Sequence, residues 1–272
     1  MIPEQAIVEW RRHAPWTANS LVEQDLVISR ALVAIYSVPE LGQSLAFRGG
    51  TALYKLYLTP AARYSEDIDL VQIRPEPIGQ TLDLLRGVLD PWLGTPQRQL
   101  KEGRVNLVYR FDSEDSPPLR MRLKIEMNSR EHFTELGLVN LPFELENQWF
   151  SGQCDVVTFA VEELLGTKFR ALYQRKKGRD LFDLWYALEQ GSVSVEALIR
   201  CFQRYMAEGG HAVARALFEA NLHEKALRRD FRRDTEPLLR PGLKWNFDEA
   251  LRAVLDQLVS RLPGDAWKGD GR

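Results

Sequence analysis

Residues 67–71, Asp-Ile-Asp-Leu-Val, alternate acidic and apolar side chains, a pattern that predicts a β-strand. Side chains two residues apart on a strand project from the same face, so Asp67 and Asp69 lie about 6–7 Å apart along one face. Ile68 and Leu70 point the other way, into a core. Two carboxylates held this close repel each other unless a cation lies between them, and hard divalent cations such as Mg²⁺ prefer oxygen ligands of this kind. This strand therefore predicts a metal site.

A second acidic strand follows later in the chain. Residues 105–111 and 119–127 are predicted strands, and the polar loop 112–118 between them suits a hairpin. The odd positions of the second strand are apolar, so Glu126 projects from its polar face. If the two acidic strands are neighbours, Glu126 joins the aspartate pair. Three carboxylates can bind two metal ions that activate an attacking hydroxyl and stabilise a leaving pyrophosphate.

The third element is Gly49-Gly50-Thr51, a glycine pair that leads into a predicted helix from Thr51 to about Leu58. Glycines let the backbone approach phosphate oxygens closely, and a helix N-terminus presents free N–H groups. The Thr51 hydroxyl could add a donor. Each element alone is common. An Asp-x-Asp pair is usually part of a solvated strand edge, a glycine pair usually forms a turn, and a lone glutamate is usually a surface residue. Together they have the order and spacing of a nucleotidyltransferase site.

The hydrophobic periodicity divides the chain into two parts. The first 45 or so residues read as helical, and a further helix is predicted over 78–90. After about residue 158 the pattern becomes helical and largely remains so, with apolar stripes over 161–172 and 181–188. We expect an α/β domain over residues 1–155 and a mostly helical domain over 156–272. No flexible linker marks the boundary.

Charge and composition limit the partners. Acidic and basic residues nearly cancel, for a formal net charge of −2, so the whole chain is not a polycation that binds nucleic acid indiscriminately. The two cysteines are too few for a disulfide framework, and we expect both to be reduced. Neither a signal peptide nor an apolar stretch of about 20 residues is visible. We expect a cytoplasmic protein with no membrane partner.

Two local basic stretches are candidates for contact with RNA. Residues 168–179 contain six cationic side chains and no acidic one. Residues 225–233 contain five, interrupted by Asp230 and accompanied by Phe231. Such stretches could bind an RNA backbone, with an aromatic ring available for stacking. The alternative interpretation is a solvated helix face.

Several motifs resemble one known family. Residues 47–53 (Phe-Arg-Gly-Gly-Thr-Ala-Leu) and 63–70 (Arg-Tyr-Ser-Glu-Asp-Ile-Asp-Leu) are similar to motifs of the AbiEii/AbiGii-type nucleotidyltransferase toxins, within the polymerase-beta-like superfamily. Residues 162–184 are similar to the family's second pair of motifs. The resemblance implies an α+β fold: a polymerase-beta-like core with a mixed sheet, flanked by helices and followed by a mostly helical C-terminal half. The chain departs from many relatives in having Gly49-Gly50 where they have Gly-Ser.

The resemblance also implies a role for each matching residue. Asp67 and Asp69 would bind the catalytic Mg²⁺, with Mn²⁺ as the alternative ion, and Glu126 would be a further metal ligand or the general base. Lys168 would bind the triphosphate and offset charge in the transition state. Asp180 would position either Lys168 or the acceptor. The implied nucleotide-binding residues are Gly49, Gly50, Thr51, Arg63, Ser65 and Lys168.

The charged residues of the helical half also have structural interpretations that involve no catalytic role. Lys168 could be a solvated lysine on an amphipathic helix. Asp180 lies near a predicted helix start, where an acidic residue also favours the dipole. For Asp183 we expect a helix-surface charge or a partner for Arg179.

The implied activity is that of a toxin. By resemblance, the chain transfers a nucleotide from an NTP to an RNA acceptor, the tRNA 3′ end above all, and so blocks translation. A cognate antitoxin encoded nearby is the implied partner. It could bind the toxin, act indirectly, or phosphorylate a residue near the site such as Thr51 or Ser65. Two alternatives remain: nucleotidylation of a protein hydroxyl, and a non-catalytic nucleotide-binding module.

Overall fold

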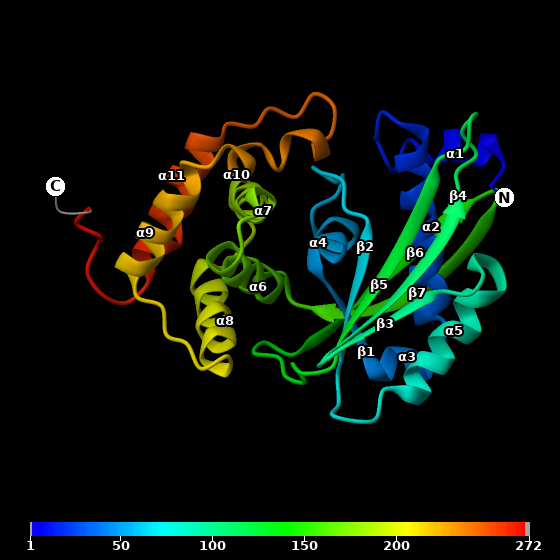
Figure 1. Ribbon diagram of the computed structural model, residues 1–272, viewed down its shortest axis with the longest axis horizontal. Coiled ribbons are helices and arrows are strands. Elements are labelled where there is room, and N and C mark those ends of the chain that lie inside the picture. The colour runs from blue at the N-terminus through cyan, green and yellow to red at the C-terminus, as the bar shows by residue number, and fades with distance from the viewer. Residues whose placement is uncertain (1, 270–272) are drawn as a thin grey trace. The chain divides into compact units, whose positions relative to one another are not determined.

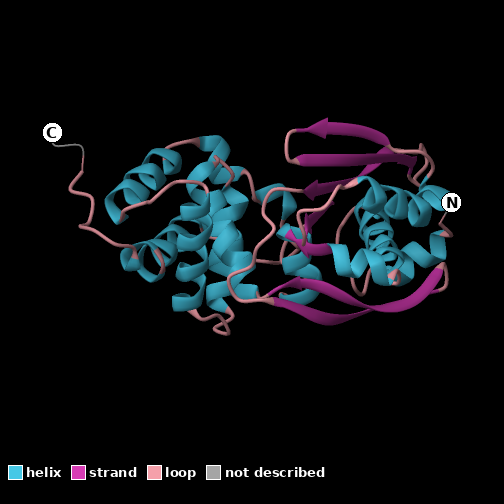
Figure 2. Cartoon of the chain, turned by 90° about the horizontal axis from the view of Figure 1, so that it is seen from below, coloured by secondary structure: helices cyan, strands magenta, loops and turns pink. Residues whose placement is uncertain are grey.

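The computed structural model describes residues 2–269. The chain divides into two compact units, Met1–Phe159 and Ala160–Arg272. The division falls four residues after the boundary expected from the sequence, because a long strand that the sequence analysis did not predict ends at Phe159. Figure 2 shows that the strands belong to the first unit, whereas the described part of the second unit consists of helices and loops.

The first unit combines seven strands with several helical segments. The strands are β1 (Leu45–Arg48), β2 (Asp67–Gln72), β3 (Gln97–Lys101), β4 (Arg104–Asp112), β5 (Arg120–Asn128), β6 (Leu138–Asn147) and β7 (Phe150–Phe159). The helices are α1 (Glu4–Trp10), α2 (Asn19–Tyr36), α3 (Pro39–Ser44), α4 (Gly49–Ala52), which continues as the π-helical segment η1 (Leu53–Tyr57), and α5 (Gly79–Leu93).

The strands form one mixed sheet in the order β3-β4-β5-β2-β1-β7-β6. β2 pairs with β5 in parallel and β1 pairs with β7 in parallel, whereas all other neighbours are antiparallel. The parallel pairing brings the two acidic strands together in the middle of the sheet although they are distant in sequence. The predicted α+β class with a mixed sheet is confirmed.

Helices α2 and α5 cover one face of this sheet (Figure 1). Alternate residues of the central strands point toward them, and Ile68, Leu107 and Ile125 are fully buried. Tyr109 lies on the same face and donates a hydrogen bond of 2.8 Å to Asp90 of α5. This alternation leaves the other residues of β2, β4 and β5 on the opposite face, where α4 packs against β2.

Some local predictions hold and others do not. The hairpin between residues 105–111 and 119–127 is confirmed as the antiparallel pair β4–β5. The helix predicted from Thr51 begins at Gly49, so the glycine pair forms its first residues and not a turn before it. The sequence analysis did not predict β1, β3, β6 or β7. β6 contains Pro142, which fits because β6 is an edge strand and proline lacks the N–H that an inner strand needs.

The second unit packs its helices around an aromatic core. They are α6 (Val161–Gln174), α7 (Gly178–Glu189), α8 (Val195–Glu208), α9 (Arg215–Ala226), α10 (Arg229–Arg233), η2 (Glu236–Leu238), α11 (Phe247–Gln257) and η3 (Val259–Arg261). The rings of Phe169, Phe202 and Phe218 have centroids 4.5–5.8 Å apart, a separation typical of packed aromatic pairs. No helix within residues 2–269 is both long enough and apolar enough to cross a membrane.

Lys225 of α9 stabilises the end of a neighbouring helix. Its ammonium donates hydrogen bonds of 2.5 and 2.6 Å to the carbonyl oxygens of Leu172 and Tyr173, in the last turn of α6. Carbonyls at a helix C-terminus lack partners within the helix, so a cation there satisfies them. Burial lowers the pKa of Lys225 to about 8. This lysine is part of the interior and not of a basic surface.

Candidate active site

The two acidic strands lie side by side in the sheet of the first unit. In the parallel pairing of β2 with β5, Asp67 is opposite Lys124 and Asp69 is opposite Glu126. Register partners on neighbouring strands are about 4.8 Å apart and project from the same face. The sequence left the pairing of these two strands as a condition, and the structure meets that condition.

The side chain of Lys124 lies among these carboxylates. Its ammonium is 2.7 Å from Glu126 Oε2 and 3.8 Å from Asp67 Oδ2, while Arg104 Nε lies 3.1 Å from Glu126 Oε1. Burial alone would lower the pKa of Lys124. The hydrogen bond to Glu126 and the charges of Asp67, Glu126 and Asp69 outweigh this effect, so its pKa is raised. The chain thus supplies its own cation to the acidic face.

Gly49 lies directly against Asp69. Its φ of +84° is in the left-handed region that favours glycine. A Cβ at this position would overlap the Asp69 carboxylate and would lie only 2.9 Å from its Cγ. Helix α4 can begin beside the acidic strand because residue 49 has no side chain.

Replacing Gly49 therefore tests this contact. If Asp69 acts in the nucleotide transfer that the resemblance implies, Gly49→Ala should lower the rate by about 100-fold, because the new methyl group displaces Asp69 and an error of about 1 Å at a reacting group has an effect of that size. Initial rates at saturating NTP measure it. Gly87→Ala on α5, where a new Cβ meets no atom within 4 Å, is the matched control and should keep wild-type activity. Equal rates for both variants would show that Asp69 does not need its present position.

Thr51 and Ser65 connect α4 to the start of β2. Thr51 is 2% exposed, and its hydroxyl donates a hydrogen bond of 2.5 Å to the backbone oxygen of Asp67. The Ser65 hydroxyl lies 2.9 Å from the Thr51 hydroxyl. Since the Thr51 hydroxyl is already used inside the fold, we assign it the positioning of Asp67 and not a contact with phosphate. Ser65 is the more exposed of the two hydroxyls.

Arg63, the other residue implied in nucleotide contact, is only 3% exposed. Its Nη1 donates a hydrogen bond of 2.9 Å to the backbone oxygen of Tyr64, and its guanidinium lies 5.1 Å from the ring centroid of Tyr54. These contacts hold the guanidinium in the interior of the first unit. The structure gives Arg63 a place in the packing next to the site.

An amide shares the face that carries the carboxylates. Asn106 of β4 is the register partner of Glu126 and is 7% exposed. Within residues 2–269, its side-chain oxygen Oδ1 is buried with no hydrogen-bond partner. An unsatisfied buried amide costs free energy, so this oxygen would gain from a donor or a cation. Carboxylate and amide oxygens are also the ligands that Mg²⁺ accepts.

The donors therefore suit a hard divalent cation in their chemistry. They are not gathered around one point, because no group of three acidic, histidine or cysteine side chains in the described chain is arranged to hold a metal ion. Glu126 is paired with Lys124 and Arg104. Asp67, Asp69 and Glu126 can hold a divalent ion together only after Glu126 exchanges these partners.

A second charged cluster lies inside the second unit. Lys168 of α6 has its Nζ 2.9 Å from Asp183 Oδ2 and 3.5 Å from Asp180 Oδ1. Both aspartates are fully buried on α7, and Lys168 is 7% exposed. Residues three apart share one face of a helix, which explains why both carboxylates meet the same lysine.

Arg175 completes this cluster. Its Nε and Nη2 lie 2.6 and 2.7 Å from the two oxygens of Asp180, in the paired geometry that suits a guanidinium and a carboxylate. Asp180 is thus held between Arg175 and Lys168, which favours its role in positioning Lys168. The interpretation of Asp183 as a surface charge or a partner for Arg179 is wrong, because Asp183 is fully buried and pairs with Lys168.

The structure also shows which side chains of the two basic stretches are paired or buried and which lie at the surface. Several cations of residues 168–179 pair with acidic groups of the second unit: Arg175 with Asp180, Lys176 with Glu224, and Lys177 with Asp234. In the stretch 225–233, Lys225 is 2% exposed and Phe231 is fully buried. Phe231 therefore cannot stack on a base as the sequence suggested. The arginines of this stretch remain at or near the surface.

Two solved structures have this fold. MenT4, a nucleotidyltransferase toxin from Mycobacterium tuberculosis, is similar with a TM-score of 0.66 at 17% identity, over 95% of this chain and 91% of that chain. A structure assigned to the nucleotidyltransferases from H. pylori is similar with a TM-score of 0.52 at 16% identity, over 89% of this chain and 95% of that chain. The chain therefore has the nucleotidyltransferase fold.

The sequence identifies the family within that fold. The family described as nucleotidyl transferase AbiEii toxin, type IV toxin–antitoxin system, matches residues 30–253. The match covers most of the chain, so the chain belongs to this family and is a nucleotidyltransferase of the toxin type. The resemblance read from the motifs is confirmed. No protein in the curated set is significantly similar to the chain in sequence.

The sequence analysis missed three residues that the structure places with the predicted ones. Lys124 and Asn106 occupy even positions of β5 and β4, on the face of Glu126, so strand alternation contained the signal for both. Asp183 lies one helical turn after Asp180, and that spacing was the signal for a shared face.

Proposed function

We propose that this chain transfers a nucleotidyl group from an NTP to the 3′-hydroxyl of an RNA, with the acceptor end of tRNA as substrate, and that this blocks translation. The observation that carries the proposal is the pairing of β2 with β5, which aligns Asp69 with Glu126 on the face that holds Asp67. Family membership supports nucleotidyl transfer. The RNA acceptor and a cognate antitoxin as partner rest on the resemblance of the motifs.

We assign metal binding to Asp67, Asp69 and Glu126, with Mg²⁺ as the ion and Mn²⁺ as its substitute. Such an ion supplies charge neutralisation and activation of the attacking hydroxyl. Burial raises the pKa of Asp67, and Glu66 and Glu126 add to this against the opposing effect of Lys124 and Arg122. A carboxylate in such surroundings is stabilised in its charged form by a nearby cation, which supports this assignment.

The remaining residues bind and orient the reactants. The RNA 3′-oxygen forms a bond to the α-phosphorus, the bond to the bridging oxygen of the β-phosphate breaks, and pyrophosphate leaves. A carboxylate has two oxygens, so we assign to Glu126 both a bond to the ion through one oxygen and the acceptance of the 3′-hydroxyl proton by the other. Lys168 binds the triphosphate: an ammonium has three N–H donors, and Asp180 and Asp183 account for two. We assign contact with a phosphate oxygen to the backbone of Gly49 and Gly50 at the start of α4, where Gly49 is partly exposed and Gly50 is buried.

A transfer assay tests the proposal. The purified protein is incubated with Mg²⁺, total tRNA and each labelled NTP in turn, and the products are separated on a denaturing gel. We expect label in tRNA with the wild type, and none with Asp67→Asn or with excess EDTA, because both remove the bound ion. Label on protein would instead assign the acceptor to a protein hydroxyl. No label from any NTP would favour a nucleotide-binding module and overturn the proposal.

A further inference from the structure

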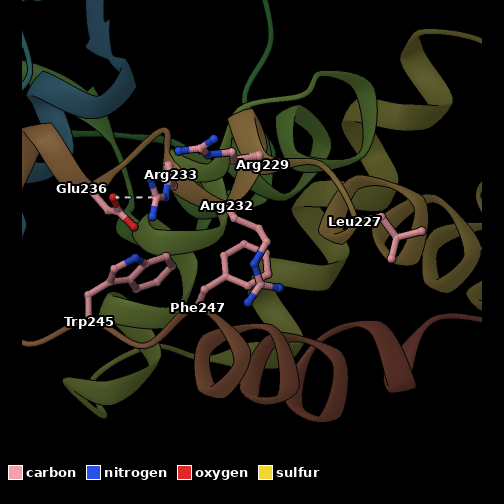
Figure 3. Close-up of a pocket in the computed structure, with 7 residues that line it drawn as sticks. All are labelled: Leu227, Arg229, Arg232, Arg233, Glu236, Trp245 and Phe247. Carbon is pink, nitrogen blue, oxygen red and sulfur yellow. Dashed lines mark ion pairs between the residues drawn. The ribbon is translucent and has the colours of Figure 1, made fainter.

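A pocket of about 490 Å³ lies in the second unit, between α10, the segment that follows it and the start of α11 (Figure 3). Its volume is in the range of small-molecule binding sites. Three arginines, two aromatic side chains and one glutamate line it: Arg229, Arg232, Arg233, Trp245, Phe247 and Glu236. The proposed catalytic roles do not use any of them.

The arginines come from one face of α10, because positions 229, 232 and 233 are three and four residues apart. Arg232 is fixed in place: it lies 4.3 Å from the ring centroid of Phe247 and 2.8 Å from Asp248 Oδ2. Arg233 is only 3.8 Å from Glu236, the pair drawn with a dashed line in Figure 3. Arg229 is exposed and makes no ion pair with any other residue in 2–269.

Trp245 forms an aromatic wall of the pocket. The centroids of Phe182 and Trp185 lie 5.1 and 5.6 Å from its ring, both in edge-on geometry. Phe247 packs edge-on at 6.1 Å from another side. These contacts hold the indole rigidly, while the side chain stays partly exposed to the pocket. Phe182 and Trp185 belong to α7, the helix that also carries Asp180 and Asp183.

We propose that this pocket binds an unpaired nucleotide of the acceptor RNA, with the guanidinium groups on backbone phosphates and the base stacked on Trp245. The proposal rests on the proposed function, since it names the place where the RNA acceptor is held. Proteins bind single strands by combining backbone cations with aromatic stacking, and the planar guanidinium matches phosphate oxygens in pairs. A chain with a net charge of −2 must attract RNA through a local patch, and the three arginines of the pocket outnumber the two carboxylates that pair with them, Glu236 and Asp248.

A binding experiment without NTP tests this site. The dissociation constants of a labelled single-stranded RNA and of tRNA are measured by fluorescence anisotropy at several salt concentrations. We expect Arg229→Glu and Trp245→Leu each to weaken single-strand binding by about tenfold, the usual scale for one phosphate or stacking contact. Arg229→Glu should also reduce the slope of log Kd against log salt by about 1. The matched control is Arg204→Glu, an exposed arginine of α8 outside the pocket, and thermal melts confirm that each variant is folded.

The outcomes separate this inference from the proposed function. In the transfer assay, Arg229→Glu should raise the KM for RNA with little change in kcat or in the KM for NTP. RNA binding by both pocket variants equal to that of Arg204→Glu overturns the inference, even if the wild type labels tRNA. A raised KM for NTP alone assigns the pocket to free nucleotide and also overturns it. If the wild type binds RNA through the pocket but labels none, the proposed function fails while the RNA site stands.

Discussion

Asp69→Asn is expected to reduce nucleotide transfer by about 1000-fold or more and to leave the fold intact. Losing one group that stabilises charge in the transition state has an effect of this order or larger. Asn has the same shape as Asp, so it fits the space beside Gly49. The substitution also removes one negative charge from a face that holds three carboxylates, so it should not destabilise the first unit. Single-turnover rates with labelled NTP and tRNA measure the loss.

Two comparisons make this result specific. Asp83→Asn replaces an exposed aspartate on α5 and should keep wild-type activity. Mg²⁺ or Mn²⁺ should raise the melting temperature of the wild type, since an ion that binds only the folded state stabilises it, and the increase should be smaller in Asp69→Asn. Transfer by Asp69→Asn within tenfold of the wild-type rate would rule out Asp69 as a metal ligand.

Lys168→Met is expected to lower the free energy of unfolding by about 3–5 kcal/mol, the usual cost of removing one member of a buried ion pair. Met fills a similar volume but leaves Asp183, which is fully buried, without the ammonium 2.9 Å away. Asp180 is less affected because Arg175 still pairs with it. Urea unfolding followed by circular dichroism measures the change.

The double variant Lys168→Met with Asp183→Asn separates stability from catalysis. Replacing the Asp183 carboxylate, which has lost the ammonium of Lys168, with an uncharged amide should recover part of the lost free energy of unfolding. Transfer activity should stay low, because the triphosphate still lacks its lysine. A double variant that regains both stability and activity would show that Lys168 only stabilises the helical unit.

Strand alternation explains why much of the carboxylate face could be predicted from the sequence. Asp69 and Glu126 each stand between two apolar neighbours, and Asp67 is separated from Asp69 by Ile68, so the face of each strand follows from a period of two. The pairing of β2 with β5 joins strands that are distant in sequence, and a period of two within each strand does not specify it. The sequence analysis could therefore only assume that the two strands are neighbours. The motifs of the family supplied the remaining information about fold class.

The surroundings of residues that depend on tertiary packing were harder to predict from the sequence. The charges of Lys124 and Lys168 are evident in the sequence, but their positions beside carboxylates depend on which strands and helices are neighbours. Phe231 looked like a stacking residue because it lies between arginines, yet it points into the core, whereas Trp245 lines the pocket. β3 is fully exposed and has no apolar pattern, so periodicity could not reveal it.

The ammonium of Lys124 between Asp67 and Glu126 offsets part of the negative charge of the acidic face. Folding need not wait for a divalent ion, because a built-in countercharge already relieves the repulsion along the two acidic strands. Under the proposed assignment of the metal, a divalent ion replaces this ammonium at the carboxylates when it binds, and the extent of binding follows the concentration of the free ion. Under the same assignment, a newly made chain can therefore reach its folded state before the ion binds, and its activity then depends on the supply of both ion and nucleotide.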